Sequence, residues 1–150
     1  MCTPREMLER VTIARDNIIP ITGECIEEVK EPVIGLNTSQ LYDEGVDADG
    51  NHLTKYRNPT YAHIKNSMNP GPGFGRPDLY LTGEFQQNMN LRVEGDVFEI
   101  DSSDVKSAEL KDKYGEKIFG LTQESKQEAW PIVRQPLVEK VAEIMQCNVG

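Results

Sequence analysis

The sequence predicts an α+β fold: a kinked N-terminal helix, a small antiparallel sheet with a hairpin, a C-terminal helix and a long polar loop or arm. Apolar residues recur at helical spacing near both ends of the chain, which indicates two amphipathic helices. Apolar and polar residues alternate on both sides of Glu94-Gly95-Asp96, which indicates a hairpin. Proline and glycine interrupt residues 66–77, which indicates the loop.

At 150 residues the chain fits one domain. We divide this single domain, residues 1–150, into four parts by their sequence patterns. They are a helical part (1–32), a polar loop or arm (33–77), a β-rich part (78–121) and a C-terminal helix (122–150).

The first helix is expected to begin after Thr3, which can cap it, and Glu6 can complete a capping box. Its apolar stripe is made of Leu8, Val11, Ile18, Ile21, Cys25 and Val29. Pro20 interrupts the stripe, because proline removes a backbone donor and disfavours helical geometry at the residue before it. A single kinked helix fits best, and two helices broken near Ile19 are the alternative. Pro32 is expected to end the segment.

Helical periodicity is lost over residues 33–77. Asp49-Gly50 is a turn signal at the tip of a short hairpin. Residues 66–77 form a loop longer than most compact domains contain, and such loops tend to be functional or disordered. We interpret this one as an arm that becomes ordered on a neighbouring subunit, with a flexible loop as the alternative. Its candidate subunit-interface residues are Asn69, Pro70, Pro72, Phe74 and Arg76.

The β-rich part is predicted to open with a short strand at Leu79-Tyr80-Leu81. Thr82 then caps a short helix that reaches Asn88. The buried face of the following hairpin is predicted to contain Leu91, Val93, Phe98 and Ile100. Glu99 and Asp101 lie on its opposite face, exposed to solvent or turned toward an adjacent subunit.

Two helices complete the prediction. A short helix covers residues 107–113 and ends at Gly115. Thr122 caps the final helix, in which Pro131 and Pro136 should produce a kink or a slow start. Its apolar stripe is Ala129, Val133, Leu137, Val141 and Ile144 or Met145. We interpret Trp130 as packing on the hairpin, with a subunit interface as the alternative.

The net charge of −9 is concentrated in residues 78–121, which hold ten acidic and five basic side chains. Binding to nucleic-acid phosphates needs clustered lysine and arginine, and the sequence has no basic run. We therefore expect no sequence-specific nucleic-acid binding. A surface lining a DNA channel would be acidic, but ordinary solubilising charge predicts the same composition and is the simpler interpretation.

The cysteines, Cys2, Cys25 and Cys147, are odd in number and widely spaced. This pattern predicts neither a disulfide framework nor a zinc site, and it favours a reducing compartment. The first residues lack an apolar signal core, and no window approaches the roughly 20 apolar residues of a membrane span. We expect an intracellular protein that does not enter the membrane.

Motifs for catalysis or metal binding are incomplete. The segment 47–51 begins like an EF-hand loop, but Gly45 and Tyr56 stand where that motif needs acidic ligands. His52 and His63 lack the His-Glu-x-x-His spacing of a zinc protease and a third ligand. Glu99 and Asp101 fit a solvated strand face better than an acid–base pair. We expect a non-enzymatic protein with no metal and no cofactor.

The order of the motifs resembles tail-completion and head–tail joining proteins of tailed bacteriophages. The polar segment with Gly50, Tyr56, Tyr61 and Lys65 is followed by a Leu-x-x-Thr-Gly-x-Phe string that begins at Leu79. After the hairpin, Phe119-Gly120-Leu121-Thr122 opens the last helix. These motifs are similar to those of HK97-type tail-completion and Mu gpG-like virion morphogenesis families. The closing part is also similar to proteins of Bacteroides and crAss-like phages.

The resemblance covers about half the chain, and the Pro/Gly insert before Asp78 departs from the family pattern. It implies a structural protein of the virion, made and assembled in the host cytoplasm. Identical subunits would form a ring at the neck or tail end, around a DNA channel, in contact with other neck and tail proteins. The alternatives are a monomeric adaptor or inhibitor that acts through residues 66–77, and a metal-dependent hydrolase.

Overall fold

The computed structural model describes residues 2–147 and has the predicted α+β architecture. Its helices and strands, in chain order, are α1 (Pro4–Asp16), α2 (Ile18–Glu28), α3 (Lys30–Ser39), the π-helical turn η1 (Gln40–Glu44), α4 (Pro59–Met68), α5 (Glu84–Gln87), β1 (Met89–Glu94), β2 (Val97–Ser102), α6 (Ser107–Tyr114), the 3-10 turn η2 (Glu116–Ile118) and α7 (Gln123–Met145). The predicted part 122–150 extends into residues 148–150, which lie outside the described residues.

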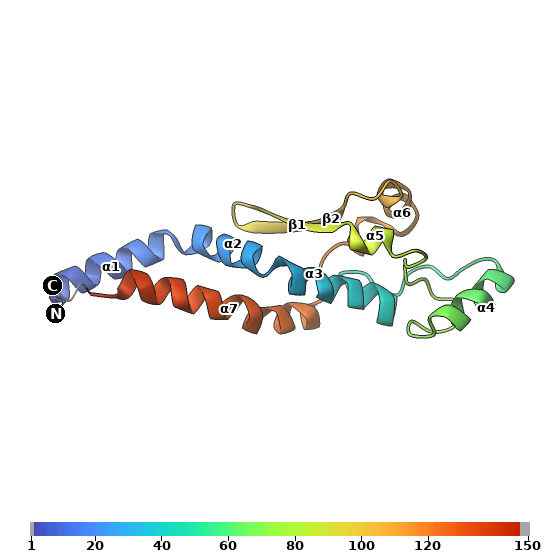
Figure 1. Ribbon diagram of the computed structural model, residues 1–150, viewed down its shortest axis with the longest axis horizontal. Coiled ribbons are helices and arrows are strands. Elements are labelled where there is room, and N and C mark those ends of the chain that lie inside the picture. Colours follow the sequence, from blue (N-terminus) through green and yellow to red (C-terminus); the bar gives the residue numbers. More distant parts are fainter. Residues whose placement is uncertain (1, 148–150) are drawn as a thin grey trace.

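The molecule is elongated, and its length is set by helices that run side by side (Figure 1). The helices α1, α2 and α3 follow one another, and α7 returns alongside them. The hairpin lies over α2 and α3 with its turn directed toward α1. The opposite end of the molecule holds α4, and α5 and α6 lie on the hairpin side near that end.

The N-terminal helix is broken twice rather than kinked once. Its first break is at Asn17 and its second at Val29. Pro20 and Pro32 are each the third residue of a new helix. The first four N–H groups of a helix have no acceptor within that helix, so the missing N–H of proline costs no hydrogen bond there. Proline is therefore tolerated there, and the prediction that Pro32 ends the helical segment is wrong. The capping box at Thr3 is confirmed, with the Glu6 amide 3.2 Å from the Thr3 hydroxyl.

The predicted polar loop 33–77 contains more helix than expected. Helix α3 continues to Ser39, η1 extends it to Glu44, and α4 occupies Pro59–Met68. The Asn58 side chain caps α4 by accepting from the Thr60 amide at 2.9 Å. An asparagine cap followed by proline at the first helical position is an ordinary helix start that the sequence interpretation overlooked.

The hairpin is confirmed, with Leu91 opposite Ile100 and Val93 opposite Phe98. Of these four, Leu91 and Ile100 are buried, and Val93 and Phe98 are half-buried against the same core. Gly95 begins the two-residue turn with a φ of 61°, a conformation that glycine adopts without strain.

The strand predicted at Leu79-Tyr80-Leu81 is absent from the described residues. Leu79 has a φ of 54°, outside the range of extended backbone. The amide of Tyr80 donates to the Asp78 carboxylate at 3.0 Å instead of to a neighbouring strand. This local bond gives the chain an alternative to strand pairing.

Most buried apolar side chains form one core beneath the hairpin, between α3 and the start of α7. Its buried members are Val33, Ile34, Leu41, Leu53, Phe85, Met89, Leu91, Ile100, Ile118, Leu121 and Ala129. A smaller cluster of Ile21, Cys25 and Val133 joins α2 to α7. The start of the predicted N-terminal stripe is uncovered, because Leu8 is 65% exposed.

Two buried amide side chains fix the segment that leads into α7. Asn37 donates to the Ile118 carbonyl and accepts from the Gly120 amide, both at 3.0 Å. Gln40 donates to the Gly120 carbonyl at 3.0 Å and accepts from the Thr122 amide at 2.9 Å. Together they supply hydrogen-bond partners to backbone N–H and C=O groups of residues 118–122, which belong to no β-sheet.

Helix α7 begins as predicted, with the Thr122 hydroxyl accepting from the Ser125 amide at 3.1 Å. It continues without a break through Pro131 and Pro136. Trp130 is 52% exposed, so the interpretation that it packs on the hairpin is wrong.

Cys2 and Cys147 form a disulfide with their Cα atoms 5.5 Å apart, contrary to the expectation of unpaired cysteines. The antiparallel course of α1 and α7 brings these two distant residues together. Nearby, the Arg10 guanidinium donates to the Ile144 carbonyl at 3.0 Å. Cys25 is free and buried, and burial raises the pKa of its thiol. Within residues 2–147, no helix has the length and apolar character needed to cross a membrane.

Candidate functional site

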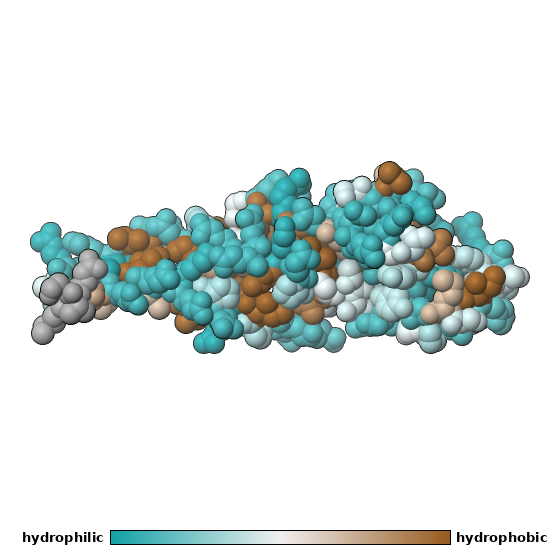
Figure 2. Space-filling view, viewed as in Figure 1, coloured by the Kyte–Doolittle hydropathy of each residue, from teal (hydrophilic) through white to brown (hydrophobic). Residues whose placement is uncertain are grey.

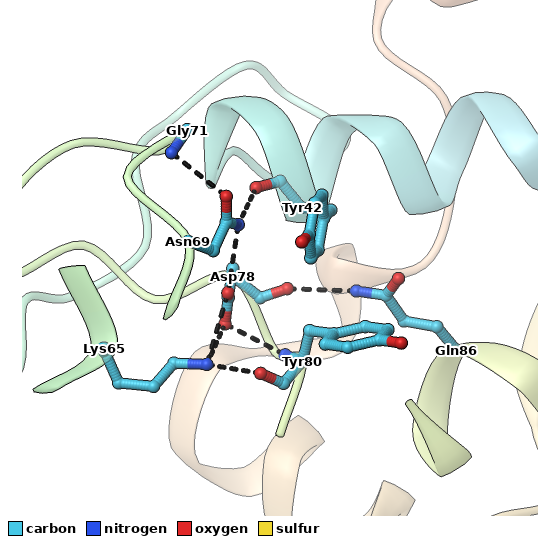
Figure 3. Close-up of polar contacts among 7 residues, drawn as sticks. All are labelled: Tyr42, Lys65, Asn69, Gly71, Asp78, Tyr80 and Gln86. Atoms are coloured by element: carbon cyan, nitrogen blue, oxygen red, sulfur yellow. Dashed lines mark hydrogen bonds and ion pairs between the residues drawn. The ribbon is translucent and has the colours of Figure 1, made fainter. Parts of the chain in front are cut away.

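The most elaborate polar cluster joins α4 to the loop that follows it, and we call it the polar hub: Lys65, Asn69 and Asp78 (Figure 3). The Lys65 ammonium lies 3.0 and 3.2 Å from the two carboxylate oxygens of Asp78 and also donates to the Tyr80 carbonyl. Lys65 is 5% exposed and Asp78 is 2% exposed. A buried ion pair must be matched by good geometry and further hydrogen bonds, and here both are present.

Further bonds connect the polar hub to the rest of the fold. The Asn69 amide group donates to the Tyr42 carbonyl at 2.7 Å and to Asp78 at 3.1 Å. The Gln86 side chain donates to the Asp78 carbonyl at 3.0 Å. The Lys65 ammonium donates to Asp78 and to the Tyr80 carbonyl and is paired with the Asp78 carboxylate, so it is held in place and its charge is compensated. This arrangement suits a structural role better than nucleophilic chemistry.

The polar hub overturns the interpretation of residues 66–77 as an unanchored arm. Asn69 is part of the hub, Pro72 and Pro77 are buried, and the Gly75 carbonyl accepts from the Tyr56 amide at 2.8 Å. A Cβ at Gly45 would lie 2.7 Å from the Pro77 carbonyl oxygen, so the loop passes directly over η1. The segment therefore belongs to the folded domain, although Phe74 remains 52% exposed.

Next to the hub lies a cavity of about 870 Å³, which we call the distal cavity. Its walls come from residues 54–58, α4, residues 79–85 and α6. The aromatic side chains in its lining are Tyr56, Tyr61, Tyr80, Phe85 and Tyr114, and the basic ones are Lys55, Arg57, Lys65, Lys106 and Lys113. Three acidic residues, Glu84, Asp104 and Glu109, complete its charged lining.

Tyr56 connects the polar hub to the distal cavity. Its ring meets that of Tyr61 edge-on, with the centroids 4.9 Å apart. Burial raises the pKa of Tyr56, and the negative charge of Asp78 raises it further. Tyr56 is therefore held as a neutral phenol, which can donate a hydrogen bond to a ligand in the cavity.

The other candidate residues do not gather into one site. Glu99 forms an exposed ion pair with Arg92 at 3.0 Å, and Asp101 lies 3.7 Å from Lys111 on the same face of the hairpin. Trp130 lies on α7. The proposed interface residues thus occupy the 69–76 loop, the hairpin and α7.

The segment that resembles a calcium loop is stabilised by its own hydrogen bonds. Asp47 accepts from the amides of Asp49 and Asn51 at 2.9 and 3.0 Å, and Asp49 lies 2.6 Å from the Lys117 ammonium. The predicted Asp49-Gly50 turn is present, and a single bridge between Val46 and His52 closes it. In the part of the chain that the structure describes, no three His, Cys, Asp or Glu residues are placed to hold a metal.

Large apolar side chains are exposed along the half of the molecule that holds α1, α2 and α7, and again near α4 (Figure 2). On the helices α1, α2 and α7, which we call the helical arm, they are Met7, Leu8, Val11, Ile13, Ile18, Ile19, Trp130 and Val138. Near α4 they are Tyr61, Ile64, Met68, Phe74 and Leu81. Surface clusters of this kind commonly mark sites of protein association.

Sequence reasoning missed the distal cavity, although one signal was present. Residues 50–77 contain four basic residues and no acidic one, in a protein of net charge −9. The charge balance of the longer 33–77 part concealed this difference, because four acidic residues precede Gly50.

Comparisons with protein-family models, curated proteins and solved structures found no match to this chain.

Proposed function

We propose that this protein is a non-enzymatic structural subunit of a tailed-bacteriophage virion that forms a ring at the neck or tail end. The proposal starts from the resemblance of the motifs between Leu41 and Thr122 to tail-completion and head–tail joining proteins. In this proposal the protein binds identical copies of itself and other neck and tail proteins.

The observation that carries the proposal is the uncovered apolar surface of the helical arm. Leu8 is 65% exposed, Ile19 is 53% exposed and Trp130 is 52% exposed. Fully burying a large apolar side chain stabilises by about 1.5–3 kcal/mol, so several partly exposed ones along the helical arm favour association with another protein surface. Copies packed side by side along the helical arm would cover these side chains.

The alternative of a monomeric adaptor or inhibitor has less support than the ring-forming subunit. The adaptor or inhibitor alternative relied on residues 66–77 as an unanchored arm, and that segment is held by the polar hub. The exposed apolar residues would then have no partner. The hydrolase alternative receives no specific support from the geometry, because the Lys65 ammonium is engaged by Asp78 and the Tyr80 carbonyl within the protein.

Sedimentation velocity over a wide range of protein concentrations, combined with electron microscopy of the largest species, tests the proposal. A closed oligomer of defined size is expected at high concentration or when neck proteins are added. Leu8→Asp combined with Ile19→Asp should weaken assembly, whereas the control pair Gln87→Asp and Ser103→Asp, at exposed positions outside the helical arm, should not. A mass that stays at 16.9 kDa under all these conditions would contradict the proposal and favour the monomeric adaptor.

A further inference from the structure

The distal cavity is lined by five basic and three acidic side chains, an excess of positive charge on a protein of net charge −9. Lys55, Arg57, Lys106 and Lys113 line it, and no carboxylate lies within ion-pair distance of any of them among residues 2–147. In contrast, Arg92, Lys117 and Lys140 elsewhere on the surface are each paired with acidic side chains. The unpaired cations of the cavity are therefore available to an acidic partner.

The lining of the cavity also suits a peptide rather than a bare anion. Four tyrosines and exposed Leu81 surround the charged groups, so the walls offer both hydrogen-bond donors and apolar contact. A volume of about 870 Å³ lies within the usual range of ligand pockets, roughly 300–1,000 Å³. A fitting occupant would carry carboxylates and one small apolar side chain on a narrow turn.

The turn of the hairpin has this composition. The Glu94 side chain is 62% exposed and lies 3.2 Å from the Arg92 guanidinium, and Asp96 and Val97 are exposed. Gly95 keeps the turn narrow. The turn is also free of the hairpin core, because the buried pair Leu91 and Ile100 lies farther along the strands.

The turn lies away from the cavity of its own chain. It lies beside the first residues of α2, where Gly95 and Asp96 share a shallow groove with Ile18 and Ile19. It is directed toward α1, whereas α4, α5 and α6 are at the opposite end of the hairpin (Figure 1). A contact between turn and cavity must therefore join two copies of the chain.

We infer that the acidic hairpin turn, residues 94–97, of one copy docks in the distal cavity of the next copy. This inference rests on the proposed function, because it supplies a contact that repeats around the ring. Turn and cavity are different surfaces, so the contact is head to tail, the type that closes into a ring when the rotation fits. Complementary charge would guide the copies together and fix their register.

Charge reversal on each side of the contact provides the test. Lys55→Glu/Arg57→Glu places acidic groups in the cavity, and Glu94→Lys/Asp96→Lys places basic groups on the turn. Each variant alone should associate at least about tenfold more weakly than the wild type in sedimentation velocity. An equal mixture should recover association, because the acidic turn of the cavity variant meets the unchanged cavity of the turn variant. Likewise, the basic turn of the turn variant meets the acidic cavity of the cavity variant.

Matched controls place the same charge changes on surface residues that lie outside the turn, the distal cavity and the helical arm. Lys111→Glu/Lys117→Glu corresponds to the cavity variant, and Asp43→Lys/Glu44→Lys to the turn variant. Circular dichroism and thermal unfolding check that all four variants fold. The inference predicts that the two control variants assemble like the wild type and do not rescue either partner variant.

Three outcomes would overturn the inference. Normal assembly by both reversal variants would leave the ring intact and exclude this contact. Failure of the mixture to recover would show that the two surfaces do not meet. Loss of single-stranded oligonucleotide binding in the cavity variant, with unchanged self-association, would assign the cavity to nucleic acid. A wild-type protein that never associates contradicts the proposed function itself, so the two failures are distinguishable.

Discussion

Asn37 and Gly120 are joined by a partly buried hydrogen bond of 3.0 Å from the Gly120 amide to the Asn37 side-chain oxygen. The nitrogen of the same side chain donates to the Ile118 carbonyl, also at 3.0 Å. One fully buried side chain on α3 thus satisfies a backbone donor and a backbone acceptor on either side of Phe119. It fixes the segment from which α7 begins.

Asn37→Ala should destabilise the fold strongly, because it leaves both backbone groups without a partner inside the protein. Each orphaned group costs about 1–3 kcal/mol, and the two losses should add. Urea unfolding measures the difference in free energy. Asn17→Ala, which removes an exposed side-chain bond to the Ile13 carbonyl, is the matched control and should cost well under half as much. Equal losses from the two variants would contradict the role of Asn37.

The buried pair Lys65 and Asp78 gives a second prediction about stability. Lys65→Met leaves Asp78 as an uncompensated buried charge and should cost about 3–5 kcal/mol. The double variant Lys65→Met/Asp78→Leu removes both charges and should be more stable than Lys65→Met alone. Guanidinium unfolding of the wild type, both single variants and the double variant completes the cycle. Additive losses would show that the two side chains act independently.

The hairpin and α7 were predictable because their signals are local. Alternation around Gly95 sets the strand register, and Thr122 followed by Ser125 marks a helix start. The burial of Lys65 had no such signal. Its partner Asp78 lies thirteen residues away, beyond a loop rich in proline and glycine, and only tertiary packing brings the two charges together. Asn37 was missed for the same reason, since its partners are more than 80 positions away.

The Cys2–Cys147 disulfide is another contact between distant residues that the sequence did not reveal, and it gives a third prediction. An odd number of cysteines at wide spacing suggested none, yet the pairing of α1 with α7 places these two beside each other. Cys147→Ser should lower the melting temperature of the oxidised protein, because removing a native disulfide typically costs about 2–5 kcal/mol.

Cys2→Ser provides the control for this disulfide. Each single variant and the double variant remove the same bond, so all three should melt together, and reductant should lower only the wild type to their level. Non-reducing electrophoresis checks that the wild type is oxidised. If reductant left the melting temperature of the oxidised wild type unchanged, the disulfide would contribute nothing to stability.

Tyr56 gives a prediction about alkaline pH. Burial, with the negative charge of Asp78 added to it, raises the pKa of Tyr56 above its value in the unfolded chain, about 10. The folded state therefore holds this proton more tightly, and the resulting stability is present in full below about pH 10. It is lost as the pH rises from there through the raised pKa of the folded state. Tyr56→Phe has no phenol to ionise and should lose less stability between about pH 8 and pH 11 than the wild type does. Tyr42→Phe leaves Tyr56 in place and should follow the wild type. Urea unfolding at both pH values measures the change, and identical alkaline losses for Tyr56→Phe and Tyr42→Phe would show that Tyr56 ionises as freely in the folded protein as in the unfolded chain.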